Sequence, residues 1–172
     1  DYIIRCDVCQ RTGRPTKRDA LPLTPIPCPL PFAKWGIDYV GPISPPSGSN
    51  RARWILVMTD YMTRWAEAAA VPDNTAETTA RVLYTQVITR FGCPTQIVSD
   101  RGVHFLNDVI KELTQFFDIT HSKSTPYYPQ CNGLAESTNK TLIRILLKVC
   151  AKEKHSWAAR LPTVLWAYRT TY

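Results

Sequence analysis

The sequence predicts an α/β fold in which a mixed β-sheet packs against helices. Residues 35–71 hold three runs rich in β-branched and aromatic residues, separated by short turn signals. Beyond residue 74, apolar residues recur at helical spacing, and helical segments alternate with short strands. The resulting order, β-β-β-α-β-α-β-α-α, is typical of a mixed layer fold that begins with a meander. A chain of 172 residues with 44% hydrophobic residues suits one domain with a short attachment.

The first three strands are expected to form an antiparallel meander. The first, 35–43, surrounds one acid with apolar and aromatic residues and stops at Gly41-Pro42. The second, 53–61, is almost entirely apolar until Asp60, which we interpret as structural, and the third covers 65–71. Because short turn signals join these runs, consecutive strands should pair with each other.

A helix is expected to start near Asn74, which can cap it together with Glu77 three residues later. Gly92 and Pro94 should end this helix. The remaining elements follow in alternation: a strand at 96–100, a helix at 104–117, a strand at 119–124, and two helices at 134–152 and 156–169.

The N-terminal region is predicted to contain part of a metal site. Residues 1–13 include Cys6 and Cys9, whose C-x₂-C spacing lets two thiolates share one zinc ion. A structural zinc site needs four ligands, and no histidine lies nearby in sequence. Residues 14–34 contain six prolines and are interpreted as an extended linker, which leaves 35–172 as the main domain.

The charge distribution indicates a polyanionic partner. The net charge is +7, and residues 119–172 carry eight basic side chains against Glu136 and Glu153. Such an excess is typical of nucleic-acid binding, although a solvated basic helix face explains it equally well. No apolar run approaches the ~20 residues that span a bilayer, so no membrane association is expected. The chain lacks an initiator Met and a leader pattern, and we expect it to be a piece of a longer polypeptide.

Three carboxylates stand at positions that suit metal chemistry. Asp38 lies within the first strand, Asp100 at the end of the fourth, and Glu136 at the start of the basic helix. A shared divalent cation would offset the cost of an acid inside an apolar strand, and hard ions such as Mg²⁺ prefer oxygen ligands. Taken one at a time, the residues have plain structural explanations: an edge acid, a turn residue and a helix N-terminal acid.

These residues occur in a pattern that resembles the integrase catalytic core of gypsy-type LTR retrotransposons, a relative of retroviral integrases. The family's D,D-35-E pattern is matched by Asp38, Asp100 and Glu136, with 35 residues between the last two. The short motifs around these acids also match the family; they are WGIDYVGP, SDRG, and YPQ followed by NGLAESTN. The sequence departs from the family at Tyr128, often His, and at Cys131, often Gly. Neither position is one of the three acids.

The resemblance implies a ribonuclease H-like fold and Mg²⁺ or Mn²⁺ held by the three acids. It implies 3′-end processing and strand transfer of element DNA into target DNA, by homo-oligomers that act in the nucleus after synthesis within a cytoplasmic polyprotein. Cys6 and Cys9 resemble the second half of the family's His-His-Cys-Cys module, so Zn²⁺ would bind in the complete module.

Within this family resemblance, the helix that begins near residue 134 is expected to contact DNA. Lys140 lies four residues after Glu136 and so shares its face, and Arg144 and Lys148 continue the stripe. We expect this stripe to contact the phosphate backbone of element DNA. A surface ion pair between Glu136 and Lys140 is the plain alternative. Polar groups expected to reach bases or sugars near the cut are Gln130, Asn132 and Asn139.

Three other functions stay open at the level of sequence. The chain could be a DNA-binding or assembly module that is inactive alone, or a genomic relic. It could also be another ribonuclease H-like nuclease or a cut-and-paste transposase, although the loop words and the cysteine pair favour an integrase.

Overall fold

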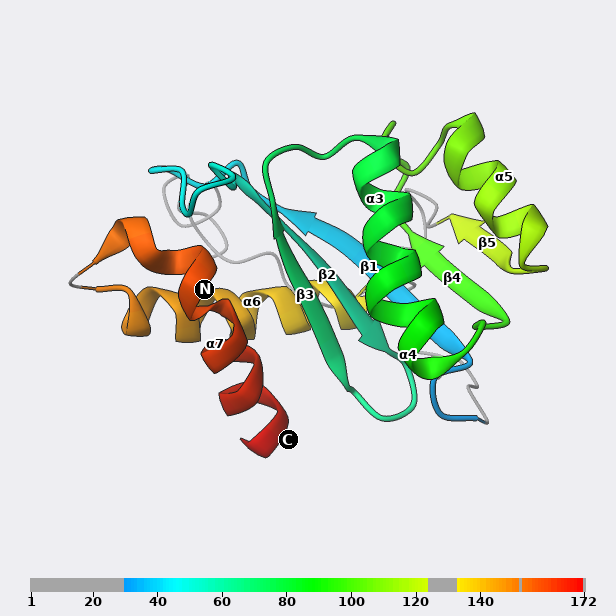
Figure 1. Ribbon diagram of the computed structural model, residues 1–172. Coiled ribbons are helices and arrows are strands. Elements are labelled where there is room, and N and C mark those ends of the chain that lie inside the picture. Colours follow the sequence, from blue (N-terminus) through cyan, green and yellow to red (C-terminus); the bar gives the residue numbers. More distant parts are fainter. Residues whose placement is uncertain (1–29, 124–132, 152, 172) are drawn as a thin grey trace, which may run out of the picture.

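The five strands form one mixed sheet with the order β3-β2-β1-β4-β5 (Figure 1). The computed structural model describes residues 30–123, 133–151 and 153–171. Strands β1 (Lys34–Val40), β2 (Trp54–Asp60) and β3 (Ala66–Val71) pair antiparallel, which confirms the predicted meander. Strands β4 (Gln96–Ser99) and β5 (Thr120–Lys123) continue the sheet in parallel with β1. The mixed α/β sheet predicted from the sequence is therefore confirmed.

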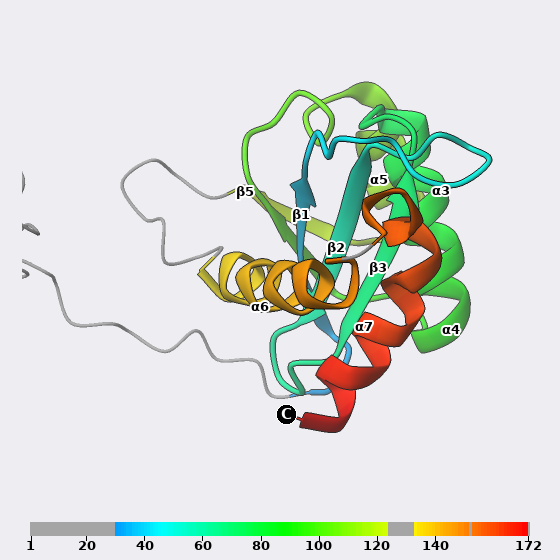
Figure 2. The same ribbon diagram turned by 90° about the vertical axis from the view of Figure 1, so that its left-hand side faces the viewer.

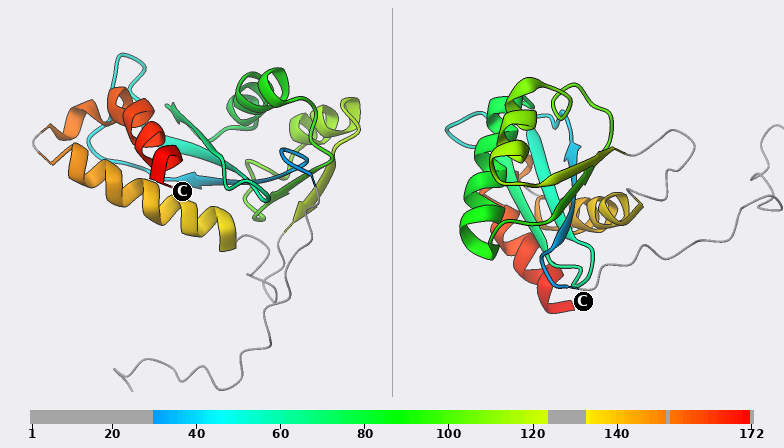
Figure 3. Two further views of the ribbon diagram at one scale, coloured as in Figure 1. Left: turned by 90° about the horizontal axis from the view of Figure 1, so that it is seen from below. Right: turned by 90° about the vertical axis from the view of Figure 1, so that its right-hand side faces the viewer.

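Helices cover both faces of this sheet. One face carries α3 (Ala76–Leu83), the π-helical turn η1 (Tyr84–Ile88), α4 (Thr89–Phe91) and α5 (Asp108–Phe116). The helix α6 (Gly133–Val149) crosses the opposite face, and the short helix η3 (Lys154–Ser156) leads into α7 (Trp157–Thr171) (Figures 2 and 3). Among the described residues, no helix has the length and apolar character needed to cross a bilayer.

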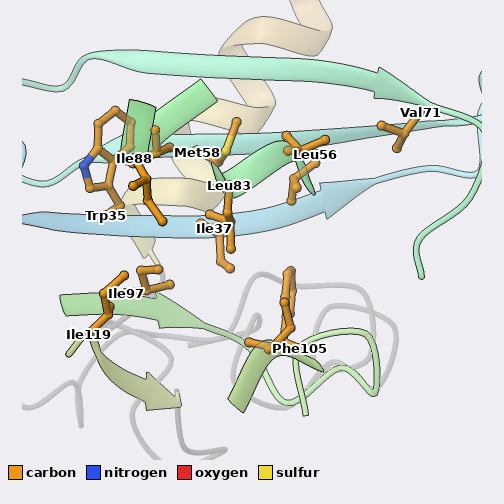
Figure 4. Close-up of a cluster of buried hydrophobic side chains, with 13 residues drawn as sticks. Trp35, Ile37, Leu56, Met58, Val71, Leu83, Ile88, Ile97, Phe105 and Ile119 are labelled. Carbon is orange, nitrogen blue, oxygen red and sulfur yellow. The ribbon is translucent and has the colours of Figure 1, made fainter. Parts of the chain in front are cut away.

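Alternation along β2 sends side chains into two separate cores. Leu56 and Met58 point toward α3 and α5 and join the cluster shown in Figure 4, together with Ile37 and Phe105. Ile55 and Val57 point the other way. They pack against α6 and α7 in a second cluster that includes Leu142, Leu146, Trp157 and Leu165. Because both faces of β1 and β2 are covered, these strands read as nearly continuous apolar runs in the sequence.

Two predicted helix starts are wrong by a few residues, each because a different side chain forms the cap. Thr75, not Asn74, caps α3 by accepting a hydrogen bond from the backbone N–H of Thr78. Asn107 caps α5 through the N–H of Ile110, so this helix starts later than the predicted residue 104. The residues before Asn107 form a turn instead, in which the Phe105 N–H donates to the carbonyl of Gly102.

Asp60 has the structural role that the sequence predicts. It is fully buried, and both oxygens of its carboxylate accept hydrogen bonds. One accepts from the N–H of Phe32 at 2.9 Å, and the other from the N–H and hydroxyl of Thr63 at 2.7 Å each. Phe32, which the sequence assigns to the linker, also stacks on Trp35 and packs against Phe91. Asp60 thus ties the chain that enters β1 to the β2–β3 turn.

A buried ion-pair cluster that the sequence reading did not predict joins β3 to α4 and α7. The carboxylate of Glu67 is almost completely buried and lies 2.7 Å from Arg169 and 2.9 Å from Arg90. It also accepts a hydrogen bond from the indole N–H of Trp65. Arg169 donates further to the carbonyl of Ala66 and lies over the Trp65 ring. These bonds supply the partners that a buried carboxylate requires.

Candidate metal centre on the helix α6 face of the sheet

The sheet brings Asp38 close to the end of the neighbouring strand that leads to Asp100. Gly36 of β1 pairs with Val98 of β4; Asp38 lies two residues further along β1, and Asp100 follows the last residue of β4. Parallel strands lie about 4.8 Å apart, so the two backbones are adjacent at this point. Both acids share the sheet face of Gly36, where an added Cβ would meet Ala135 of α6 at 3.5 Å. The first and fourth strands along the chain are thus neighbours in the sheet.

Local hydrogen bonds hold both carboxylates in place. Asp38 accepts from the backbone N–H of Tyr39 at 2.8 Å and from the side-chain amide of Asn139 at 2.7 Å. Asp100 accepts from the backbone N–H of Gly102 at 2.8 Å, which closes a tight turn just beyond β4. These contacts fix the direction of each carboxylate before any ligand arrives.

The third acid comes from the helix laid across the sheet. Glu136 lies in the first turn of α6 with its side chain exposed to solvent. Burial raises the pKa of Asp38 from 3.8 to about 6, and the negative charges of Asp100 and Glu136 add to that rise. The two hydrogen bonds to Asp38 oppose the rise without cancelling it. Asp38 therefore lies within electrostatic range of both Asp100 and Glu136, although the three residues are distant in sequence.

This arrangement lacks a positive charge among the groups that perturb Asp38. Its perturbing charges are both negative, and its oxygens are hard donors of the kind that Mg²⁺ and Mn²⁺ prefer. A divalent cation between Asp38, Asp100 and Glu136 would turn their repulsion into attraction, so the donor set fits such an ion. Within the described residues, however, no three acidic, histidine or cysteine side chains already converge tightly enough to hold an ion.

Glycine is required at position 102 by close packing. A Cβ at this residue would lie 2.4 Å from Cε1 of His104 and 3.0 Å from Oδ1 of Asp100. His104 in turn lies edge-on to Tyr39 and Phe105, with ring centroids 4.9 and 4.3 Å away. The turn that carries Asp100 is thus packed against an aromatic cluster. This close packing explains why a glycine stands at the end of the SDRG motif.

Comparison with known proteins identifies the family. Residues 29–129 match the family model described as Integrase core domain. The chain belongs to this family. It is similar to the Transposon Tf2-3 and Tf2-4 polyproteins of Schizosaccharomyces pombe, with 28% identity over 170 residues and 98% of the chain covered. The chain spans 12% of the length of these curated relatives. The predicted resemblance to retrotransposon integrases is confirmed.

A solved structure supports the fold of this integrase core. One chain in the cryo-electron-microscopy structure of the simian T-cell lymphotropic virus intasome, in complex with PP2A regulatory subunit B56 gamma, matches with a TM-score of 0.74. The match covers 94% of the integrase core and 56% of that chain, at 22% identity. At this identity the likeness concerns the fold alone, and it confirms the ribonuclease H-like class.

The basic stripe of the integrase core is exposed, as its helical spacing requires. Lys140, Arg144 and Lys148 lie on the solvent side of α6, opposite the residues that pack on the sheet. Within the described residues no ion pair joins Lys140 to Glu136, so the plain alternative of a surface ion pair does not account for Lys140.

Asn139 is mostly buried and contacts Asp38, while its predicted contact with DNA stays a prediction. The residue is 7% exposed, and its amide nitrogen donates to Asp38. Its Oδ1 has no hydrogen-bond partner among the described residues. Because Asn139 lies three residues after Glu136, the helical period places both near the edge of the buried face of α6. That spacing was the signal that could have linked Asn139 to the acids.

The other predicted site residues lie outside the described parts of the chain. These are Gln130 and Asn132, predicted to contact DNA, and Cys6 and Cys9, predicted to bind zinc.

Proposed function

We propose that this integrase core catalyses metal-dependent 3′-end processing and strand transfer of element DNA into target DNA. The proposal is supported by the position of Asp38 on β1 next to Asp100 at the end of the neighbouring parallel strand β4, together with the helix α6 that supplies Glu136. A metal-dependent polynucleotidyl transferase needs such oxygen donors and no protein nucleophile.

In the proposed reaction, Asp38, Asp100 and Glu136 hold Mg²⁺ or Mn²⁺. Bound there, the ions would polarise the scissile phosphate and lower the pKa of the attacking water or hydroxyl group. In processing, a water oxygen attacks phosphorus and the 3′ oxygen of the retained strand leaves. In strand transfer, that 3′-hydroxyl attacks a target phosphodiester, and one P–O bond forms as another breaks. Asn139 keeps the Asp38 carboxylate oriented throughout, because it donates to it from the buried face of α6.

The exposed basic stripe of α6 is the proposed binding surface for the backbone of element DNA. Lys140, Arg144 and Lys148 follow Glu136 along the helix, so a phosphate chain lying on them would lead to the acids. Such contacts would position DNA without reading its sequence. We further propose that the complete protein works as a homo-oligomer in the nucleus, with Zn²⁺ bound by its complete N-terminal module.

Strand transfer by an isosteric variant tests the catalytic proposal. The chain, or a longer version of it, is incubated with Mg²⁺ and labelled element-end DNA. Asp100→Asn should abolish end joining, because it removes a charge needed to hold the ions. Asp118→Asn is a matched control, since Asp118 is exposed and its φ of 55° suits asparagine. Joining by Asp100→Asn at the parental rate would refute the proposal.

The salt dependence of DNA affinity tests this proposed binding surface. Replacing Lys140 and Arg144 by Gln should reduce the slope of log affinity against log salt by about 0.9 for each lost phosphate contact on a duplex. Lys154→Gln, in the exposed η3 turn, is the matched control. An unchanged slope in the double variant would exclude the α6 stripe as the surface that binds the DNA backbone.

The exposed basic stripe of α6 would also suit a second function, that of a DNA-binding or assembly unit without chemistry of its own. A DNA-binding or assembly unit would show salt-dependent binding with no metal-dependent cleavage at any enzyme concentration. Another ribonuclease H-like nuclease or transposase would cleave DNA without preference for element ends. The same labelled substrates, with unrelated ends as competitor, separate these outcomes.

A further inference from the structure

A polar pocket of about 300 Å³ lies between α5 and β5, at the edge of the sheet. Lys111 and Thr114 line it from the helix, His121 and Lys123 from the strand, and Phe105 forms part of its floor. The two faces of the pocket therefore come from consecutive elements of the chain. None of these residues belongs to the site described above.

The charges in this pocket are predominantly positive. Lys111 and Lys123 are exposed, and within the described residues neither forms an ion pair. Asp108 is the acid among the described lining residues. His121 and Lys123 stand two residues apart on β5 and so share one face of the strand. Burial lowers the pKa of His121, and the positive charge of Lys123 lowers it further. Two unpaired cations against one acid favour an anionic ligand over a metal ion.

The pocket is connected to the strand end that carries Asp100. Nε2 of His121 lies 2.8 Å from the hydroxyl of Ser99, and that hydroxyl donates to the carbonyl of Asp100 at 2.8 Å. Because the Ser99 proton is used in this bond, the imidazole donates to the hydroxyl oxygen. A ligand held in the pocket would thus lie on the α5 face of the sheet, joined through His121 and Ser99 to the backbone of Asp100, whereas the three acids lie on the α6 face.

We propose that the α5–β5 pocket binds one phosphodiester of a nucleic-acid strand through Lys111 and Lys123. The volume is at the small end of ligand pockets and suits a phosphate with its sugar. Two ammonium groups on flexible stems suit a phosphate as point charges. This inference deepens the proposed function, because it adds a second backbone contact on the other side of the acids from α6.

A metal-free binding experiment tests this site. A short labelled single-stranded oligonucleotide is titrated with the chain in EDTA, over a range of salt concentrations. The variant with Lys111→Gln and Lys123→Gln should bind about tenfold or more weakly, since a hydrogen bond to a charged group contributes about 1.5–3 kcal/mol. Its salt slope should fall by about 0.7 for the lost phosphate contact. Lys154→Gln is the matched control, since the exposed turn η3 that contains it (orange) lies at the opposite end of the molecule from α5 (Figure 1).

A second measurement locates the ligand directly. Inorganic phosphate is titrated into the parental chain while the imidazole signals of His121 are followed by nuclear magnetic resonance. The His121 signals should shift with saturation, and the shift should disappear in the double lysine variant. If His121 is unaffected, or if the double variant binds the oligonucleotide like Lys154→Gln, the pocket is not a phosphate site. Neither readout requires catalysis, so a failure of the catalytic proposal in the Asp100→Asn assay would leave this result interpretable.

Discussion

Replacing Asp38 by Asn should stabilise the metal-free protein at neutral pH while removing its activity. The Asp38 carboxylate has a pKa raised from 3.8 to about 6, first by burial and then by Asp100 and Glu136. At about 1.4 kcal/mol for each tenfold change in proton affinity, this rise corresponds to about 3 kcal/mol, which solvent screening of a partly buried group reduces to roughly 1–2 kcal/mol. An ionised Asp38 thus destabilises the folded chain at pH 7.

The variant can keep its hydrogen bonds. Asn at position 38 still accepts from Tyr39, and rotation of the Asn139 amide would turn its unpaired Oδ1 toward the new donor. The rotation pairs Oδ1 and leaves Nδ2 without a partner in its place, so the number of unpaired groups stays the same.

The pH dependence of unfolding supplies the assay. The folded state binds more protons than the unfolded state between about pH 4 and 6, because the folded pKa is the higher one. Stability from this group is therefore full below pH 4 and lost as the pH rises through 6. Urea denaturation from pH 4 to 7 should show the parent losing about 1–2 kcal/mol relative to Asp38→Asn across that range.

Asp73→Asn is the control of opposite sign. Hydrogen bonds from Thr78 and Thr75 lower the pKa of Asp73, so its stabilisation is present at neutral pH and lost as the pH falls. This variant should be less stable than the parent at pH 7, with the difference shrinking in acid. Equal pH profiles for the parent and Asp38→Asn would refute the argument from burial and repulsion.

Further expectations concern metal binding and the buried polar groups. Mg²⁺ or Mn²⁺ should raise the melting temperature of the parent but not of Asp100→Asn, as followed by differential scanning fluorimetry; equal shifts in both would place the ion elsewhere. Glu67→Gln should cost about 3–5 kcal/mol in urea denaturation, because it leaves two arginine charges without their buried partner. Glu153→Gln, which loses an exposed ion pair of 3.8 Å, should cost under about 1 kcal/mol. Asp60→Asn should lower the free energy of unfolding by about 1–3 kcal/mol, because an amide nitrogen would face hydrogen-bond donors of Thr63 or Phe32. A change under about 0.5 kcal/mol in urea denaturation would contradict the structural role of Asp60.

Several features of the fold could be predicted because they depend on local patterns. The apolar runs of β1 and β2, the helical spacing of α6 and the stop at Gly92 are each encoded by neighbouring residues. The starts of α3 and α5 were missed, since several nearby residues can cap a helix and tertiary packing selects among them.

The sequence by itself determined the three acids Asp38, Asp100 and Glu136, their spacing and the motifs around them. The resemblance to the integrase family follows from these motifs. Only the tertiary structure decided that β4 pairs with β1, since strand order depends on long-range packing. It also decided that Asn139 points inward to Asp38 and that Glu67 of β3 meets Arg90 of α4 and Arg169 of α7. These contacts join residues up to about a hundred positions apart, and no local period or propensity encodes a partner at that distance.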